Sequence, residues 1–268
     1  MKIPQSVLES RHPLPMTDIN FEQRPARRFG LSRVFGALIR PRQAFAELTS
    51  ESRATWWTPM LVLSVTAILV VIVAGYLKSR AAMMGEISLP PDWQYWTPDM
   101  QNNYTQAQQA TQGPTFMYVI PLVGALASLW VGWLLLAALL HFGSTLLGGR
   151  GSMQSALNVV AWAGLPFAVR DILRIVFMFS AGHAIVSPGL SGFASSAGFV
   201  SGLLARADVF LIWNMILLVI GFGIADGLSR NKAVAGVIGV MLLVLLAQAG
   251  LGALGSGFGA LAVQRPFF

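Results

Sequence analysis

The stretch AGLPFAVRDILRIVF, residues 163–177, carries three charged side chains in a segment that is otherwise apolar enough to cross a bilayer. At about 100° per residue of α-helix, Arg170, Asp171 and Arg174 fall within an arc of about 100°. Charge at mid-bilayer costs at least a few kcal/mol, so this arc should face other helices or a wet cleft. The stretch therefore predicts a membrane helix with one polar, inward side.

The composition supports a membrane protein over the whole chain. Of the 268 residues, 55% are hydrophobic and 11% are charged, whereas an ordinary soluble domain has about 25% charged residues. Too few polar side chains remain to cover a water-exposed globule of this size. The chain has no cysteine, which excludes disulfides, thiolate metal ligands and a cysteine nucleophile.

Five apolar stretches each approach the ~20 residues that a bilayer requires. They are residues 58–77, 116–142, 157–181, 207–225 and 233–254. We therefore predict an all-α, polytopic membrane protein with five transmembrane helices and an N-terminal amphipathic surface helix. The predicted parts are a polar tail (1–30), amphipathic cytoplasmic surface helices (31–55), a five-span membrane domain with an outer loop at 78–115 (56–256), and a short C-terminal tail (257–268).

Basic residues favour a cytoplasmic N-terminus. In that orientation twelve Lys and Arg residues lie on the cytoplasmic side of the five spans and four lie outside. Because basic residues concentrate in the cytoplasmic segments of membrane proteins, we predict that the N-terminus is inside and the C-terminus outside. Lys78 and Arg80, directly after the first span, are the counterevidence.

The segment before the first span has helical periodicity. Its apolar residues recur at the spacing of one helix face, with arginines at or beside the polar face. The apolar set is Leu31, Val34, Phe35, Leu38 and Ile39, and the basic set is Arg33, Arg40 and Arg42. Two interpretations stay open: a helix on the cytoplasmic membrane surface, or a helix docked on the protein's own cytosolic ends.

The predicted outer loop contains an aromatic cluster, Trp93, Tyr95 and Trp96. The cluster is a candidate contact surface for a partner. Alternatively, it rests on lipid headgroups or caps the bundle, because Trp and Tyr are enriched at membrane interfaces.

The triplet in the third span keeps one net positive charge, which a carboxylate from another span, a lipid phosphate or an anionic ligand should neutralise. Asp226, at the cytoplasmic end of the fourth span, is the protein candidate. We expect it to lie within ion-pair reach of Arg170 or Arg174. The resulting charge network either fixes helix register or belongs to a substrate or ion pathway.

Sequence motifs for catalysis are missing. The chain has no G-x-x-x-x-G-K-[ST], no H-E-x-x-H and no G-x-S-x-G. We therefore predict that the protein is not an enzyme and has no catalytic residues, cofactor or metal site.

Three stretches resemble the Yip family, membrane proteins that are named for interaction with Rab/Ypt GTPases, and in particular its bacterial branch. They are LIRPRQAFAEL (38–48), WWTPMLVLSVTAILV (56–70) and LLGGRGSMQSALNVVAWAGLPFAVRDIL (146–173). The resemblance covers about residues 37–254. It implies five spans, a cytoplasmic N-terminus and no catalytic activity, and bacterial relatives look like accessory subunits, some of them accompanying ABC-type export machinery.

From these patterns we predict a non-enzymatic accessory or scaffold subunit of a larger complex in a bacterial cytoplasmic (inner) membrane. Its expected partners are the lipid bilayer and other membrane-protein subunits, with no nucleic acid and no small GTPase. The alternative is a small transporter or channel that uses the charged arc of the third span.

Overall fold

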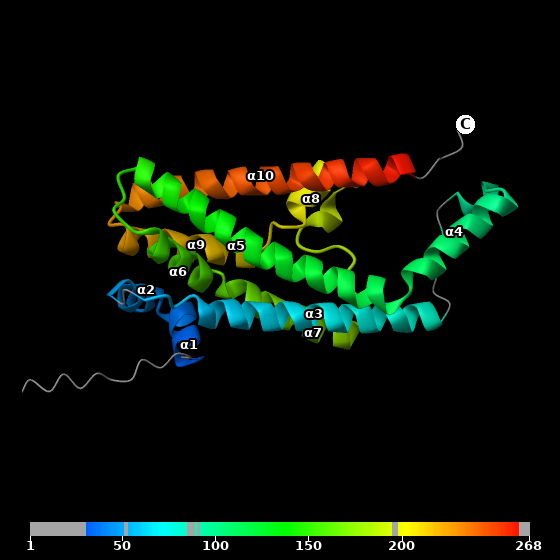
Figure 1. Cartoon of the computed structure of the whole chain (residues 1–268), viewed down its shortest axis with the longest axis horizontal. Coiled ribbons are helices and arrows are strands. Elements are labelled where there is room, and N and C mark those ends of the chain that lie inside the picture. The colour runs from blue at the N-terminus through cyan, green and yellow to red at the C-terminus, as the bar shows by residue number, and fades with distance from the viewer. Residues whose placement is uncertain (1–30, 51–52, 85–88, 90–91, 195–197, 263–268) are drawn as a thin grey trace, which may run out of the picture.

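The computed structural model describes residues 31–50, 53–84, 89, 92–194 and 198–262, with side chains described from Arg33 to Leu254. The predicted polar tail (1–30) lies outside these residues. All regular structure in the described part of the chain is helical. Figure 1 shows an elongated bundle whose longer helices run along its length.

Among the described residues, three helices are long and apolar enough to cross a membrane: α3 (Trp57–Met83), α5 (Ile120–Leu146) and α10 (Arg230–Ala262). They match the first, second and fifth predicted spans. The 27 residues of α3 extend about 40 Å at 1.5 Å per residue, which exceeds the ~30 Å hydrocarbon core of a bilayer. Because α10 continues to Ala262, the predicted boundary of a C-terminal tail at 257 falls inside this helix.

The third predicted span is two helices, α6 (Met153–Ala163) and α7 (Leu165–Ala181), separated by Gly164. Pro166 has no backbone N–H, so it cannot continue the hydrogen-bond ladder of a preceding helix and instead occupies the first turn of a new one. In Figure 1, α7 continues toward the opposite end of the bundle from α6. The apolar stretch predicted at 157–181 is therefore helical but broken at Gly164, two residues before Pro166.

The fourth predicted span is α9 (Val209–Ala225), which has only 17 residues. Figure 1 shows that α9 begins near the middle of the bundle. Two short helices lie between α7 and α9: the 3-10 helix η4 (Ser191–Phe193) and α8 (Phe199–Leu204), which packs against α10. The start of α9 thus places polar backbone and Asp208 at mid-length in the bundle.

The two ends of the bundle differ. One end holds α1 (Leu31–Ile39), α2 (Pro41–Ser50) and the connections α5–α6 and α9–α10; we call it the α2 end. At the other, the α4 end, α4 (Pro98–Thr111) projects beyond the long helices, preceded by the 3-10 helix η2 (Trp93–Tyr95) and followed by the π-helical η3 (Thr115–Val119). The predicted outer loop therefore contains a helix that sequence analysis missed.

Hydrophobic packing is densest toward the α2 end. Phe45 of α2, Trp162 of α6 and Leu218 of α9 are almost fully buried in one apolar cluster. Asn158 of α6 ties the entry of α3 to this core: its side chain accepts a hydrogen bond from the Thr55 amide at 3.0 Å and donates one to the Arg53 carbonyl at 3.0 Å. Side-chain and backbone contacts thus fix α2, α3, α6 and α9 relative to one another.

Candidate functional site

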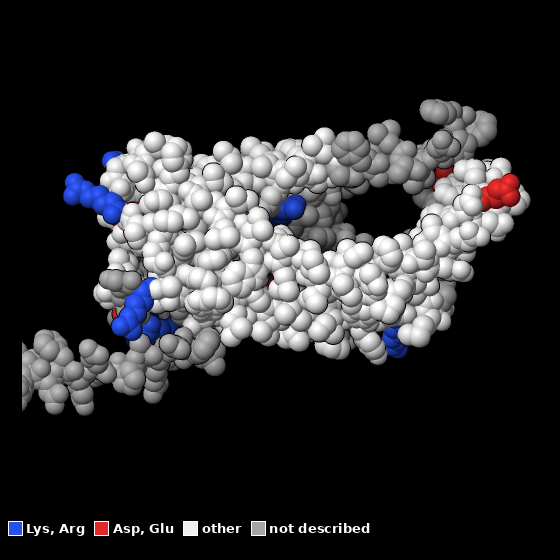
Figure 2. Space-filling view, viewed as in Figure 1, with Lys and Arg blue, Asp and Glu red and all other residues white. Residues whose placement is uncertain are grey.

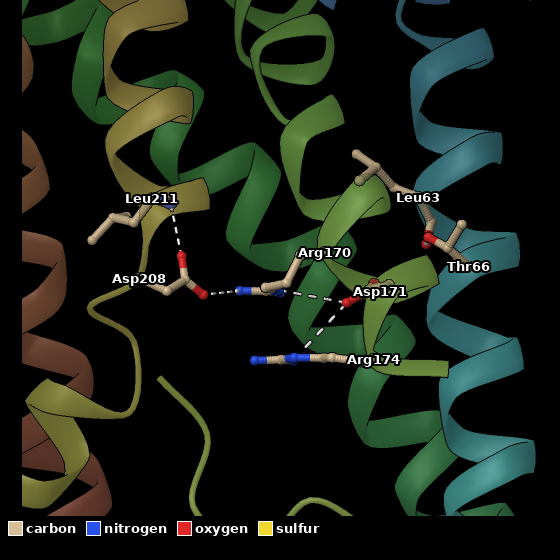
Figure 3. A network of polar contacts seen from close by, with 7 residues as sticks. All are labelled: Leu63, Thr66, Arg170, Asp171, Arg174, Asp208 and Leu211. Atoms are coloured by element: carbon tan, nitrogen blue, oxygen red, sulfur yellow. Dashed lines mark hydrogen bonds and ion pairs between the residues drawn. The ribbon is translucent and has the colours of Figure 1, made fainter. Parts of the chain in front are cut away.

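The charged residues of α7 form a connected network of ion pairs (Figure 3). Arg170 Nε lies 3.6 Å from Asp171 Oδ1, and Arg174 Nη1 lies 3.9 Å from the same oxygen. Asp171 is buried on the side of α7 that packs against α3, where Thr66 lies (Figure 3). The structure therefore brings together the three α7 residues that the sequence grouped on one helix side.

Asp208, the residue before α9, is the counter-charge that the triplet required. Its Oδ2 lies 3.5 Å from Arg170 Nη1, while its Oδ1 accepts a hydrogen bond from the Leu211 amide at 2.8 Å. Asp208 is thus both the N-cap of α9 and the ionic partner of α7. With Asp208 included, two guanidinium groups face two carboxylates, and the four charges balance.

The predicted ion pair between Asp226 and Arg170 or Arg174 was wrong. Asp226 follows the last residue of α9, so the length of that helix separates it from Asp208 and the α7 arginines. The error has a physical reason: α9 begins at mid-length, and the N-cap residue directly before it, Asp208, meets the charged arc. Asp208 carried a readable signal, since an Asp directly before an apolar run is a typical N-cap.

Asp226 is buried instead in the connections of the α2 end. Its carbonyl accepts a hydrogen bond from the Arg150 amide at 3.1 Å, and its side chain packs against Gly149 and Gly151. The side chain is 3% exposed, and neither carboxylate oxygen has a hydrogen-bond partner among the described residues. Burial raises the pKa of Asp226 above its usual range, although nearby Ser144 and His141 oppose the rise.

A cleft of about 400 Å³ adjoins the network at mid-length. Residues of α3, α5, α6, α7, α9 and α10 form its walls, and most of them are apolar. Its polar lining includes Arg170 and Asp171 from α7, Asn214 from α9, Arg206 and Gln248. Sequence analysis singled out neither Arg206 nor Asn214, because one polar residue in or beside an apolar helix has no periodic pattern to mark it.

The predicted surface helix corresponds to α1 and α2. Both helices pack on the bundle: α2 contacts α9 and α6, and α1 contacts α7 and α6. Val34 and Leu38 pack against the core, whereas Phe35 and Ile39 remain 67% and 74% exposed. One side of α1 is thus docked on the protein's own helices. That Phe35 and Ile39 contact a membrane surface stays a prediction.

The polar side of this predicted helix lines a hollow at the α2 end. Arg33 and Arg40 line a second hollow, of about 260 Å³, whereas Arg42 is exposed nearby. For Leu31, only the backbone is described, at the start of α1.

The outer aromatic residues divide into two kinds. The rings of Trp93 and Trp96 lie 5.5 and 5.6 Å from the ring of Tyr104, so both pack against α4. Tyr95 is 79% exposed and takes no part in the ring contacts among Trp93, Trp96 and Tyr104. Two of the three residues thus stabilise the α4 segment, and only Tyr95 offers its whole ring as a contact surface.

Comparison with known proteins identifies the family. The sequence model of the Yip1 domain matches residues 35–251, which is most of the chain. The chain belongs to the Yip1 family. The family membership and the three long apolar helices together make it a membrane protein, as the sequence predicted. No curated protein and no solved structure matches the chain.

The Yip1 domain includes the whole ion-pair network and its surroundings. Residues 35–251 contain the α6–α7 break, the start of α9 and the walls of the cleft. Arg170 also lies 4.7 Å from the ring centre of Phe167, a cation–π contact that further fixes its guanidinium. These interactions hold charged side chains in place, which suits positioning or binding within the membrane domain.

Proposed function

We propose that this Yip1-family protein is a non-catalytic scaffold or accessory subunit of a larger membrane complex. In this proposal α6 with α7, and α9 with the segment before it, complete two further crossings beside α3, α5 and α10. The ion pairs of Arg170 support a structural role for the network, because they join the break in the third crossing to the start of the fourth.

The uncovered apolar surface of α5 is the observation that carries this proposal. In its most apolar stretch, only 11% of the residues are buried within the chain, compared with 33% for α3. Several large side chains on α5 are about half exposed or more, namely Val123, Val131, Leu134 and Leu135. α5 contacts α3, α6 and α10 on one side, and the apolar surface on its other side is free for lipid or another subunit.

Charge supports the proposed orientation, with the N-terminus and the α2 end in the cytoplasm. Figure 2 shows several basic side chains at the α2 end and acidic ones on the projecting α4 segment, while single basic groups also lie at mid-length and toward the α4 end. Basic residues remain preferentially on the cytoplasmic side. We further propose a bacterial cytoplasmic membrane as the location and, from the resemblance to bacterial relatives, export machinery of the ABC type as the class of partner.

Photo-crosslinking from the α5 surface tests the scaffold role. A photoreactive amino acid replaces Leu134 in the full chain, expressed in the native membrane, and Ile172 of α7, which is 52% exposed, serves as the matched control. We expect a discrete adduct with a different membrane protein from position 134 and mainly lipid adducts from position 172. Adducts of position 134 with lipid alone, or only with a second copy of this chain, would contradict the proposal.

The second candidate function, a small transporter or channel, is favoured by the cleft beside Arg170. Its test is flux in reconstituted vesicles with Arg170→Met and Arg174→Met combined. Loss of flux in this variant would support transport, and unchanged flux would exclude a role of the charged arc in it.

A further inference from the structure

The mid-length cleft contains two buried polar atoms that make no hydrogen bond within the described residues. Asn214 is 2% exposed, and its Nδ2 donates a hydrogen bond to the Ala163 carbonyl at 2.8 Å, which fixes the orientation of the amide. Its Oδ1 then has no hydrogen-bond partner in the described part of the chain, and neither does Arg170 Nε. Arg170 Nε still has its ion pair with Asp171 Oδ1 at 3.6 Å, so Asn214 Oδ1 is the atom that lacks any partner. A buried acceptor without a partner costs stability unless a bound molecule supplies the missing contact.

The charge of the cleft is also incomplete. Arg170 and Arg174 face Asp171 and Asp208, so these four groups balance. Arg206 lines the same cleft and donates a hydrogen bond from Nη1 to the Gly202 carbonyl at 3.0 Å, but within the described residues no carboxylate lies within ion-pair distance of it. The lining of the cleft therefore has one positive charge more than it has carboxylates to pair with, on the exposed side chain of Arg206, and this charge favours an anion in the cleft.

The walls around these polar groups are hydrocarbon. Leu63 of α3, Leu129 and Leu136 of α5, and Leu245 of α10 line the cleft. Figure 2 shows basic atoms at mid-length, recessed between the white surfaces of α5 and α10. The volume of about 400 Å³ lies within the range of about 300–1,000 Å³ that small-molecule sites occupy. An apolar wall with a few convergent polar groups suits an amphiphile that enters sideways from the bilayer.

We propose that this cleft binds a single-chain anionic amphiphile whose head also carries a hydroxyl group. Its anionic oxygens pair with Arg206 and approach the Arg170 guanidinium, which is already ion-paired with Asp171 and Asp208. Its hydroxyl donates to Asn214 Oδ1, and its chain lies along the leucine side chains. A carboxylate and a phosphate monoester both have this chemistry. The proposal does not depend on the partner complex, because every group in it belongs to this chain.

Binding measurements on the full chain in phosphatidylcholine nanodiscs test the proposal. The probes are radiolabelled 2-hydroxyoleate, which carries a carboxylate, and 1-oleoylglycerol 3-phosphate, which carries a phosphate. We expect at least one probe to bind, and Arg206→Gln to weaken its Kd about tenfold or more, as for the loss of one charge-assisted hydrogen bond. The probe that binds more tightly identifies the class of head group.

Matched variants separate the site from general effects. Arg80→Gln removes one exposed charge from α3 at the α4 end and should leave Kd unchanged. Gly132 lines the cleft with open space where a Cβ would lie, so Gly132→Leu should fill the cleft and abolish binding, whereas Gly124→Leu, also open but outside the cleft, should not. Binding of neither probe, or equal Kd values in the Arg206→Gln and Arg80→Gln proteins, would overturn the proposal.

Discussion

Asp208 combines a helix cap with a counter-charge. One oxygen caps α9 through the Leu211 amide, and the other faces Arg170 of α7. The side chains of Asp208 and Arg170 are only 13% and 24% exposed, so water screens their interaction less than that of a surface pair. The residue thereby fixes where α9 begins and how α7 is turned.

Substitutions of Asp208 should separate its two roles. Asp208→Asn keeps a capping oxygen but leaves Arg170 without this partner, so we expect a loss of about 1–3 kcal/mol in the free energy of unfolding. Asp208→Ala also removes the cap and should cost about 1 kcal/mol more. Thermal unfolding in one detergent measures this, and we expect the unfolding temperature to fall from the wild type to Asp208→Asn and further to Asp208→Ala.

A double variant controls for effects of charge alone. In the Arg170→Met background the further change Asp208→Asn should cost less than it does alone, because its partner is already gone. Equal costs of Asp208→Asn in both backgrounds would show that the pair contributes nothing.

Asp226 should make stability depend on pH. Its pKa is raised by burial from an ordinary value near 3.8, so the folded state disfavours the charged form. The contribution of Asp226 to the free energy of unfolding is favourable at pH values below its pKa in the unfolded chain. It is lost as the pH rises through its pKa in the folded protein. Asp226→Asn should therefore unfold at a higher temperature than wild type at about pH 7.5, with the difference shrinking toward about pH 4. A difference that stays constant between these pH values would contradict this account.

At the scale of elements, the α2 end depends on close approach of helix backbones. A Cβ on Gly221 of α9 would lie 2.5 Å from Val159 Cγ1 of α6 and 3.2 Å from Phe45 Cε1 of α2. The missing side chain thus allows α2, α6 and α9 to meet around one point. Larger residues there would force the three helices apart.

Glycine substitutions test this junction. We expect Gly221→Ala to cost about 1–3 kcal/mol, as overpacking of a well-packed core does. Gly239 of α10 has no atom within 4 Å of its Cβ position, so Gly239→Ala should leave the unfolding temperature unchanged or raise it slightly. If both variants unfolded at the same temperature, the close packing of α2, α6 and α9 would be wrong.

Sequence patterns predicted some elements and missed others for physical reasons. Long apolar runs predicted α3, α5 and α10, because hydropathy alone marks such helices. The Gly164 break follows from Pro166, a local signal that a hydropathy count overlooks. The mid-length start of α9 depends on tertiary packing, which no run of apolar residues reveals. α4 could have been found, since Thr97 and Pro98 form a typical N-cap and first helical position. For the site, helix geometry correctly grouped Arg170, Asp171 and Arg174. The sequence does not show how far along the bundle α9 begins, so it could not place Asp208 and Asn214 beside them.

At the scale of the whole molecule, the long helices α3, α5 and α10 pack with the pair α6 and α7 and with the short helix α9. Gly164 separates α6 from α7, and α9 starts at mid-length, so the charged side chains of α7 meet the N-cap of α9 there (Figure 3). Polar side chains inside a lipid-embedded bundle are tolerated when they face one another or a cavity. The account requires that α6 with α7, and α9 with the segment before it, each cross the membrane.

Labelling of single introduced cysteines tests this requirement most directly, because the chain has no cysteine of its own. An impermeant maleimide is applied to spheroplasts expressing Ser229→Cys at the α2 end, Asn102→Cys in α4, or Ser187→Cys between α7 and α8; all three positions are exposed. We predict that positions 102 and 187 react from outside and that position 229 reacts only after permeabilisation. Positions 187 and 229 reacting from the same side would show that α9 does not cross, and would contradict the account.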